Sequence, residues 1–286
     1  MIDIFAELDK NFNIIEKTNN LATFLNEENK FSYGRYLIPF FELFAELFHS
    51  WKLNMNFKDL GEMLEALDIA YVSREYDARL HIRFKIGNEE QCYRFLQLII
   101  NAVKFLQDEN NWYSALKVVE FKVKDIVQKA NLDFLFDNDL GYYKLIENKP
   151  LVRQIAERTN GKLAYKLYEY NAIDNRQNAE KKRSILLYLA DYTEPITKGY
   201  NRAGDIGNLY KVLDFALNNC DVRHNNKEGS KKNNFVSELT DEQLVEVYDR
   251  IFDLFLQVLS IENTSKSLDY IEEIKDKFDQ KIYKHI

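Results

Sequence analysis

The shortage of helix-breaking residues is the feature that most constrains the fold. Only nine glycines and three prolines occur in 286 residues. Proline disrupts a helix interior and glycine weakens it, whereas sandwiches and barrels need frequent turn residues. Apolar residues recur at three- and four-residue steps, as in Leu37, Phe41, Phe44 and Phe48. The sequence therefore predicts a mainly α protein made of helical bundles.

The predicted helices are spread over the whole chain. Pro150 is suitably placed in the first turn of one of them, whereas Pro195 should kink or end another. Thr240 and Gln243 form a capping box before the apolar run that ends at Leu259. By apolar period, the main helices are expected at residues 35–50, 57–72, 89–108, 112–130, 150–159, 161–173, 177–199, 205–220, 244–259 and 265–284.

Two segments predict a minor β component. Apolar and basic residues alternate near residues 80–86, which indicates a short strand with His81, Arg83 and Lys85 on one face. Apolar runs around an acidic, Gly-containing turn predict a hairpin near residues 132–146.

We expect two domains: residues 1–140, a helical sensor or regulatory module with minor strands, and residues 141–286, a helical bundle.

Charge and cysteine content limit the class of protein. The formal net charge is −7, so any nucleic-acid site must be a local basic patch on an acidic molecule. Cys92 and Cys220 lie in separate apolar segments, which favours buried thiols over a disulfide or a metal site. The acidic start differs from a signal peptide, and the apolar stretches are too short to cross a bilayer. These features predict a cytoplasmic protein with no membrane partner.

A basic loop within residues 221–239 is the sharpest candidate site. Residues 223–232 carry a net charge of +3, and they begin with Arg223 and His224. An arginine can hold a phosphate and stabilise its developing charge, and a histidine can transfer protons near neutral pH. The predicted catalytic pair is therefore Arg223 and His224, and the loop residues predicted to bind RNA are Asn225, Asn226 and Lys227.

The same loop also has a structural interpretation. Asn218 and Asn219 would cap the end of the preceding helix, and Arg223 would pair with a carboxylate such as Asp221. A second basic run, Lys181-Lys182-Arg183, is also predicted to bind RNA, although such runs are often solvated helix faces. No Gly-rich phosphate loop, nucleophile elbow or zinc-ligand spacing is present, so neither a cofactor nor a metal is predicted.

The second half resembles the HEPN-like C-terminal region of bacterial abortive-infection proteins. The resemblance covers roughly residues 142–262. It rests on Lys182-Arg183-Ser184-Ile185-Leu186, on Leu187-Tyr188-Leu189-Ala190-Asp191, on Glu194-Pro195, on Leu217-Asn218-Asn219, on Val222-Arg223-His224-Asn225-Asn226, and on Leu239-Thr240-Asp241-Glu242-Gln243-Leu244.

The resemblance implies a helical bundle with a polar motif between two long helices. Active members of this class are metal-independent RNases that dimerise and use an arginine followed, some residues later, by a histidine. Arg223 matches the arginine and His224 fills the polar position beside it. The downstream histidine is absent, because Glu228, Gly229 and Ser230 occupy the candidate positions.

Two functions follow from these patterns. The first is an antiphage, toxin-like protein whose C-terminal domain binds RNA and, with His224 transferring protons, cleaves it as an endoribonuclease. The second is a non-catalytic interaction or scaffold protein of a defence or toxin–antitoxin system. The predicted partners are RNA, a second copy of the chain in a homodimer, and a regulatory protein.

Overall fold

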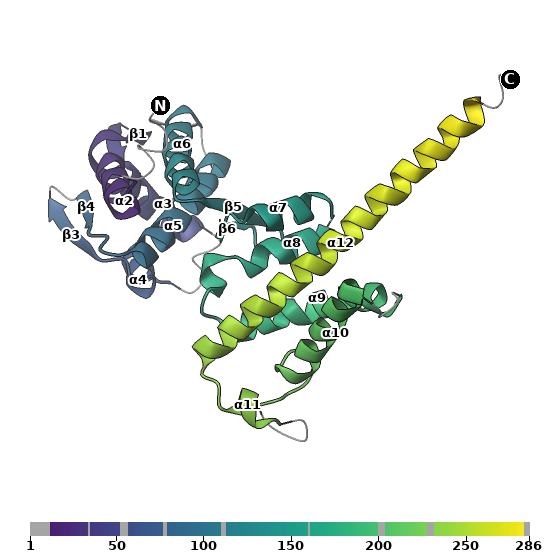
Figure 1. Cartoon of the computed structure of the whole chain (residues 1–286). Helices are drawn as coiled ribbons and strands as arrows, with labels where there is room; N and C mark the ends of the chain where they lie inside the picture. The colour runs from purple at the N-terminus through teal and green to yellow at the C-terminus, as the bar shows by residue number, and fades with distance from the viewer. Residues whose placement is uncertain are drawn as a thin grey trace, which may run out of the picture. The chain divides into compact units, whose positions relative to one another are not determined.

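The chain forms two compact units, Met1–Glu147 and Asn148–Ile286 (Figure 1). The computed structural model describes residues 12–33, 35–51, 57–76, 79–109, 113–159, 161–199, 204–227 and 232–282. Helices dominate both units, and the described strands pair into three two-stranded antiparallel sheets. The prediction of a mainly α fold with a minor β component is thus confirmed. The units divide after Glu147, seven residues beyond the predicted domain boundary, so the predicted hairpin lies in the first unit.

The first unit is a set of helices around an aromatic core. Its long helices are α5 (Glu89–Glu109) and α6 (Tyr113–Lys129), and shorter ones are α2 (Ile14–Thr23), α3 (Phe40–Leu47) and α4 (Leu60–Ala66). A π-helix (Phe24–Glu28) continues α2, and a 3-10 turn (Phe48–Ser50) ends α3. The core holds buried rings in edge-to-face or tilted contact, which include Phe40, Phe41, Phe44, Phe48, Trp51 and Phe95.

Two predicted helices of this unit are shorter than expected. Residues 36–39 form strand β2 (Tyr36–Pro39), paired with β1 (Lys30–Tyr33), so the helix predicted at 35–50 begins only at Phe40. A proline disfavours helical backbone at the residue before it, which here is Ile38. Pro39 itself is extended and serves as the N-cap of α3. The helix predicted at 57–72 ends at Ala66, because Asp68 adopts a left-handed φ of 54°. Tyr71–Tyr76 then forms β3, the partner of β4 (Arg79–Phe84).

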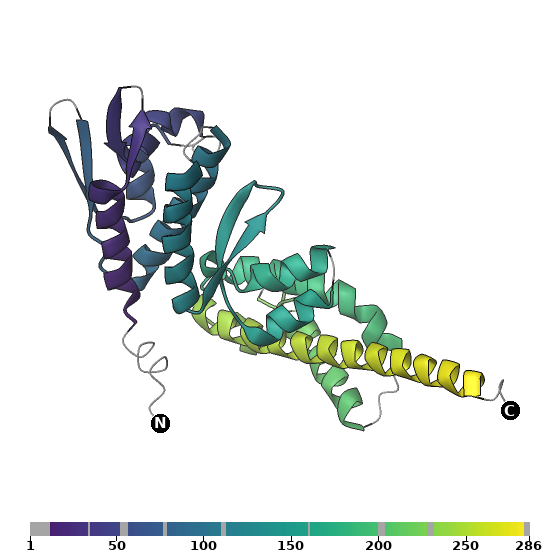
Figure 2. The ribbon, with the colours of Figure 1, turned by 90° about the horizontal axis from the view of Figure 1, so that it is seen from above.

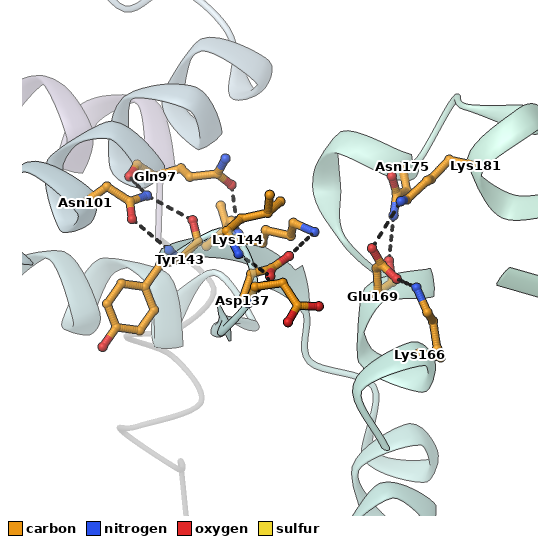
Figure 3. A network of polar contacts seen from close by, with 12 residues as sticks. Gln97, Asn101, Asp137, Tyr143, Lys144, Lys166, Glu169, Asn175 and Lys181 are labelled. Carbon is orange, nitrogen blue, oxygen red and sulfur yellow. Dashed lines mark hydrogen bonds and ion pairs between the residues drawn. The ribbon is translucent and has the colours of Figure 1, made fainter. Parts of the chain in front are cut away.

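The predicted hairpin near 132–146 consists of β5 (Leu132–Asp137) and β6 (Tyr142–Glu147), and α5 binds its outer edge (Figure 3). Asn101 accepts the N–H of Tyr143 at 2.7 Å and donates to the carbonyl of the same residue at 2.9 Å. Gln97 accepts the N–H of Leu145 at 2.8 Å. Two amide side chains of α5 therefore bind backbone groups of β6 that a neighbouring strand would otherwise bind, and they hold the hairpin against the helix.

A buried ion pair lies inside this hairpin. Lys144 Nζ is 2.8 Å from Asp137 Oδ2, and the two side chains are only 10% and 6% exposed. Asp137 Oδ1 also accepts the backbone N–H groups of Asp139 and Leu140 at 3.1 and 3.0 Å. One carboxylate thus neutralises a buried lysine and holds the turn, which Gly141 closes with a positive φ of 74°.

Glu120 on α6 should make the stability of the first unit depend on pH in the acidic range. Burial alone would raise its pKa, but hydrogen bonds from Lys124, Lys117 and Gln107 outweigh burial and lower it from 4.5 to about 2. Its contribution to the free energy of unfolding is complete above pH 4.5 and is lost as pH falls towards 2. Because both lysines are about half exposed, we expect it to be about 1 kcal/mol.

Urea unfolding of wild type and Glu120→Gln at neutral pH and at successive values below 4.5 measures this contribution. The variant should be less stable at neutral pH and should lose less stability on acidification. Asp125→Asn, at an exposed ion pair on the same helix, is the control. Parallel acid profiles of Glu120→Gln and wild type would contradict the assignment.

The second unit is a helical bundle packed on one very long helix. Its elements are α7 (Pro150–Glu157), α8 (Gly161–Tyr170), α9 (Ala179–Gly199), α10 (Gly204–Asn219), α11 (Asn234–Ser237) and α12 (Asp241–Ile282). The first half of α12 packs against α7, α9 and α10 and supplies the core rings Tyr248, Phe252 and Phe255. Phe252 stacks on Tyr170 with ring centroids 3.9 Å apart.

The ends of these helices match the sequence signals in part. The capping box is confirmed, because Thr240 and Gln243 exchange side-chain hydrogen bonds with each other's backbone N–H groups at 2.9 and 3.3 Å. Pro150 occupies the first turn of α7 as predicted. Helix α9 does not end at Pro195 but continues to Gly199. The helices predicted separately at 244–259 and 265–284 are one continuous helix.

Candidate functional site

The loop after α10 is shaped by a reciprocal pair of hydrogen bonds. The side chain of Asp221 accepts the N–H of Asn226 at 2.7 Å, and the side chain of Asn226 accepts the N–H of Asp221 at 2.8 Å. Both residues are buried, and Asp221 has a left-handed φ of 61°, which aspartate tolerates better than most residues. We call this pair the loop clamp. It leaves residues 222–225 as a short arch with fixed ends.

Arg183 of α9 binds the clamp from the neighbouring helix. Its Nε donates to the backbone carbonyl of Asp221 and lies 3.6 Å from the Oδ2 of the same residue. Tyr248 of α12 is buried close by, and burial followed by the charge of Asp221 raises the pKa of its hydroxyl. Tyr248 therefore stays protonated at neutral pH and cannot act as a base.

The arch presents its polar residues in different ways. Val222 is fully buried and anchors the arch in the core, whereas His224 and Asn225 are exposed. The backbone N–H of Arg223 donates to the carbonyl of Leu217 at 2.9 Å, which ties the arch to the last turn of α10. The loop clamp therefore holds an imidazole and an amide outward on a backbone that is fixed at both ends.

Arg223 lies between two carboxylates. Its Nη1 is 3.8 Å from Asp214 of α10, and its Nη2 is 4.0 Å from Glu194 of α9. Hydrogen bonds between a guanidinium and a carboxylate are about 2.7–2.9 Å long, so both contacts are loose. The side chain is 20% exposed. The pKa of Glu194 is lowered mainly by Lys198 and secondly by the charge of Arg223, so this carboxylate stays ionised at neutral pH.

The remaining loop residues have structural contacts. Lys227 Nζ is 3.0 Å from Asp241 Oδ1, at the start of α12. Asn233 donates its backbone N–H to the carbonyl of Asn226 at 3.0 Å and its side-chain amide to the carbonyl of Asn219 at 2.8 Å. Its side-chain oxygen caps α11. Of the predicted RNA-binding residues in the loop, Asn226 thus belongs to the clamp, and Lys227 is paired.

The second basic run is divided among three carboxylates. Lys181 Nζ is 3.3 Å from Glu169, which Lys166 also contacts at 2.5 Å (Figure 3). Lys182 is buried, lies 2.5 Å from Asp249, and sits over the ring of Tyr170. Arg183 contacts Asp221, as described above. The structure therefore brings only Arg183 of this run to the loop, whereas Lys181 and Lys182 pair elsewhere in the unit.

The sequence did not point to the carboxylates that surround these cations. The structural interpretation paired Arg223 with Asp221, but the structure gives that partner to Arg183, and Arg223 faces Asp214 and Glu194. Asp214 and Glu194 precede Arg223 by 9 and 29 residues and lie on two different helices, so no local pattern pairs them with it. Asn218 and Asn219 donate at 2.8 Å to the carbonyls four residues before them, those of Asp214 and Phe215. The terminal carbonyls of Leu217 and Asn219 are bound instead by the N–H of Arg223 and the side chain of Asn233.

Other chemistries find no support in the part of the chain that the structure describes. No group of three or more His, Cys, Asp or Glu side chains there could hold a metal ion. Cys92 and Cys220 are free, and burial raises the pKa of both thiols. None of the described helices is both long enough and apolar enough to cross a membrane.

Comparisons with known proteins return no match to this chain. No protein-family model, no curated protein and no solved structure matches it. A function for this chain must therefore be inferred from the geometry and chemistry of the loop.

Proposed function

We propose that the C-terminal unit binds RNA through Arg223, His224 and Asn225, as part of an abortive-infection type of antiviral defence. One observation carries the proposal. The loop clamp holds His224 and Asn225 exposed beside a guanidinium whose two carboxylate contacts, at 3.8 and 4.0 Å, are longer than hydrogen bonds. The defence role rests on the resemblance of residues 142–262 to abortive-infection proteins.

Each residue of the arch has a distinct role in this proposal. A phosphate offers Arg223 two short, charge-assisted hydrogen bonds in place of its loose contacts with Asp214 and Glu194. His224 and Asn225 can stack on bases or hydrogen-bond to their edges, which is how proteins recognise single-stranded RNA. The clamp reduces the entropy cost of binding because the arch does not need to be ordered on contact.

Cleavage requires a proton-transfer group next to the phosphate. His224 is the only histidine of the second unit besides His285, so the loop offers one imidazole and no second one. If bound RNA is cut, the imidazole of His224 would have to act as both the general acid and the general base. Binding is therefore the proposal, and cleavage is measured in the same experiment.

The test compares wild type with Arg223→Ala and His224→Ala in binding to end-labelled single-stranded RNA. Arg223→Ala should weaken binding by tenfold or more, because a hydrogen bond to a charged group contributes about 1.5–3 kcal/mol. The His224→Ala loss should be smaller. Arg158→Ala, an exposed arginine at the end of α7, is the matched control. Gel analysis of the same samples reports cleavage, and phage plating on cells that express each variant reports defence. Equal affinity of all four proteins would reject the proposal.

One observation favours the second candidate, a non-catalytic interaction protein. Two cations at the loop already have acidic partners within the unit: Arg183 contacts Asp221, and Lys227 contacts Asp241. The two candidates differ in what Glu194→Gln/Asp214→Asn should do. If Arg223 binds phosphate, removing the competing charges raises RNA affinity; if the loop is structural, RNA affinity stays negligible.

A further inference from the structure

Helix α12 has one half that is packed in its own unit and one half that is largely exposed in the part of the chain that the structure describes. Up to Leu259 its apolar residues are buried or half-buried against α7, α9 and α10. Every residue from Lys266 to Lys275 is exposed, although the helix continues to Ile282. Figures 1 and 2 show this second half extending beyond the other helices of the unit. We call residues 261–282 the projecting segment.

The projecting segment carries an apolar stripe. Leu268 and Ile271 are each 60% exposed, and Ile274 is 38% exposed. Their three-residue spacing places them along one side of the helix. Ile261 precedes Leu268 by one heptad, and Phe278 and Ile282 follow Ile274 in the sequence at four-residue steps. Such a repeat is the pattern by which two helices pack side by side. Nothing in the described part of the second unit covers it.

The charges of the segment indicate what covers the stripe. Residues 262–273 hold one lysine against four acidic residues, a net charge of −3. Residues 275–284 hold four lysines against two aspartates, a net charge of +2. A second copy that runs in the opposite direction therefore places each acidic half beside a basic half. A parallel copy would place like charges together, which is unfavourable.

We propose that the projecting segment pairs with the same segment of a second copy in an antiparallel coiled coil. The stripe of Leu268, Ile271 and Ile274 forms the contact, and the two oppositely charged halves set the direction. The pairing extends over about 33 Å of helix, at 1.5 Å per residue. This inference is independent of RNA binding at the loop.

Light scattering after size exclusion tests the pairing on the full chain. Wild type at micromolar concentration should have twice the 34.0 kDa mass of the chain. Leu268→Glu/Ile271→Glu should have the mass of one chain, with an unchanged helical circular dichroism signal. Lys266→Glu is the matched control, because it changes the net charge by the same amount. Lys266 is 63% exposed and lies about 160° from Leu268 and about 140° from Ile271 around the helix. A monomeric wild type, or a dimer that survives the double substitution, would overturn the proposal.

Charge reversal tests the direction. Asp269→Lys/Glu272→Lys/Glu273→Lys makes both halves basic and should weaken association about tenfold or more. Lys275→Glu/Lys277→Glu/Lys281→Glu makes both halves acidic and should do the same. Combining all six changes in one chain exchanges the two charges and should restore the dimer. Failure of the combined variant to dimerise, while both charge variants keep their helical signal, would reject antiparallel pairing.

Discussion

Asp221→Ala is expected to destabilise the second unit by about 3 kcal/mol. The substitution removes the acceptor for the buried N–H of Asn226, and an unsatisfied buried group costs about 1–3 kcal/mol. Alanine has the same Cβ as aspartate at this φ of 61°, but it lacks the polar side chain whose local hydrogen bonds let aspartate adopt the left-handed conformation. The contact with Arg183 is lost as well. The arch should lose its fixed shape, and RNA binding should fall with it.

Chemical unfolding followed by far-ultraviolet circular dichroism measures the stability loss. Asp221→Asn is the control, because asparagine keeps an acceptor for Asn226 and tolerates the left-handed conformation. That variant should stay within about 1 kcal/mol of wild type. If alanine and asparagine at position 221 lower stability equally, the charge of Asp221, and not the clamp, holds the loop.

Lys144→Met is expected to destabilise the first unit by about 3–5 kcal/mol. The change leaves the carboxylate of Asp137 buried without its neutralising partner, which is the costly way to break a buried ion pair. The double variant Asp137→Asn/Lys144→Met should recover most of the loss. Asparagine carries no charge and can still accept the N–H groups of Asp139 and Leu140.

Unfolding curves of both single variants and the double variant give the coupling energy between the two positions. The matched control is Lys129→Met, which removes an ion pair of similar length with Asp125, 2.7 Å, whose side chains are 52% and 43% exposed. That change should cost less than about 1 kcal/mol. Equal losses for Lys144→Met and Lys129→Met would show that burial adds nothing to the value of the pair.

The fold was predictable where the signal is local. The period of apolar residues gave the long helices, the acidic turn ending at Gly141 gave the β5–β6 hairpin, and the capping box gave the start of α12. Strands β1, β2 and β3 were missed for different reasons. Polar and aromatic residues alternate in β1 over only four residues, Tyr36–Pro39 continues the apolar period of α3, and β3 has no strict alternation. Their pairing depends on contacts with the next segment, which a single-segment pattern does not contain.

The candidate site was predictable only as a position. The sequence identified Arg223 and His224 in a polar loop, and the structure places that loop at the end of α10. It did not reveal that Asp221 and Asn226 bind each other, or that Glu194 lies beside Arg223 from 29 residues away. Lys182 and its partner Asp249 are 67 residues apart, so helix packing alone decides that this lysine is buried.

The amide side chains of Gln97 and Asn101 also have a consequence for how the chain behaves when concentrated. Exposed strand edges recruit strands from other molecules and promote aggregation. The backbone groups of Tyr143 and Leu145 that would template such recruitment are already occupied by α5. The aromatic hairpin of the first unit is therefore protected on this side from intermolecular sheet growth. Two amides on a helix achieve here what charged or proline-containing edge strands achieve in other proteins.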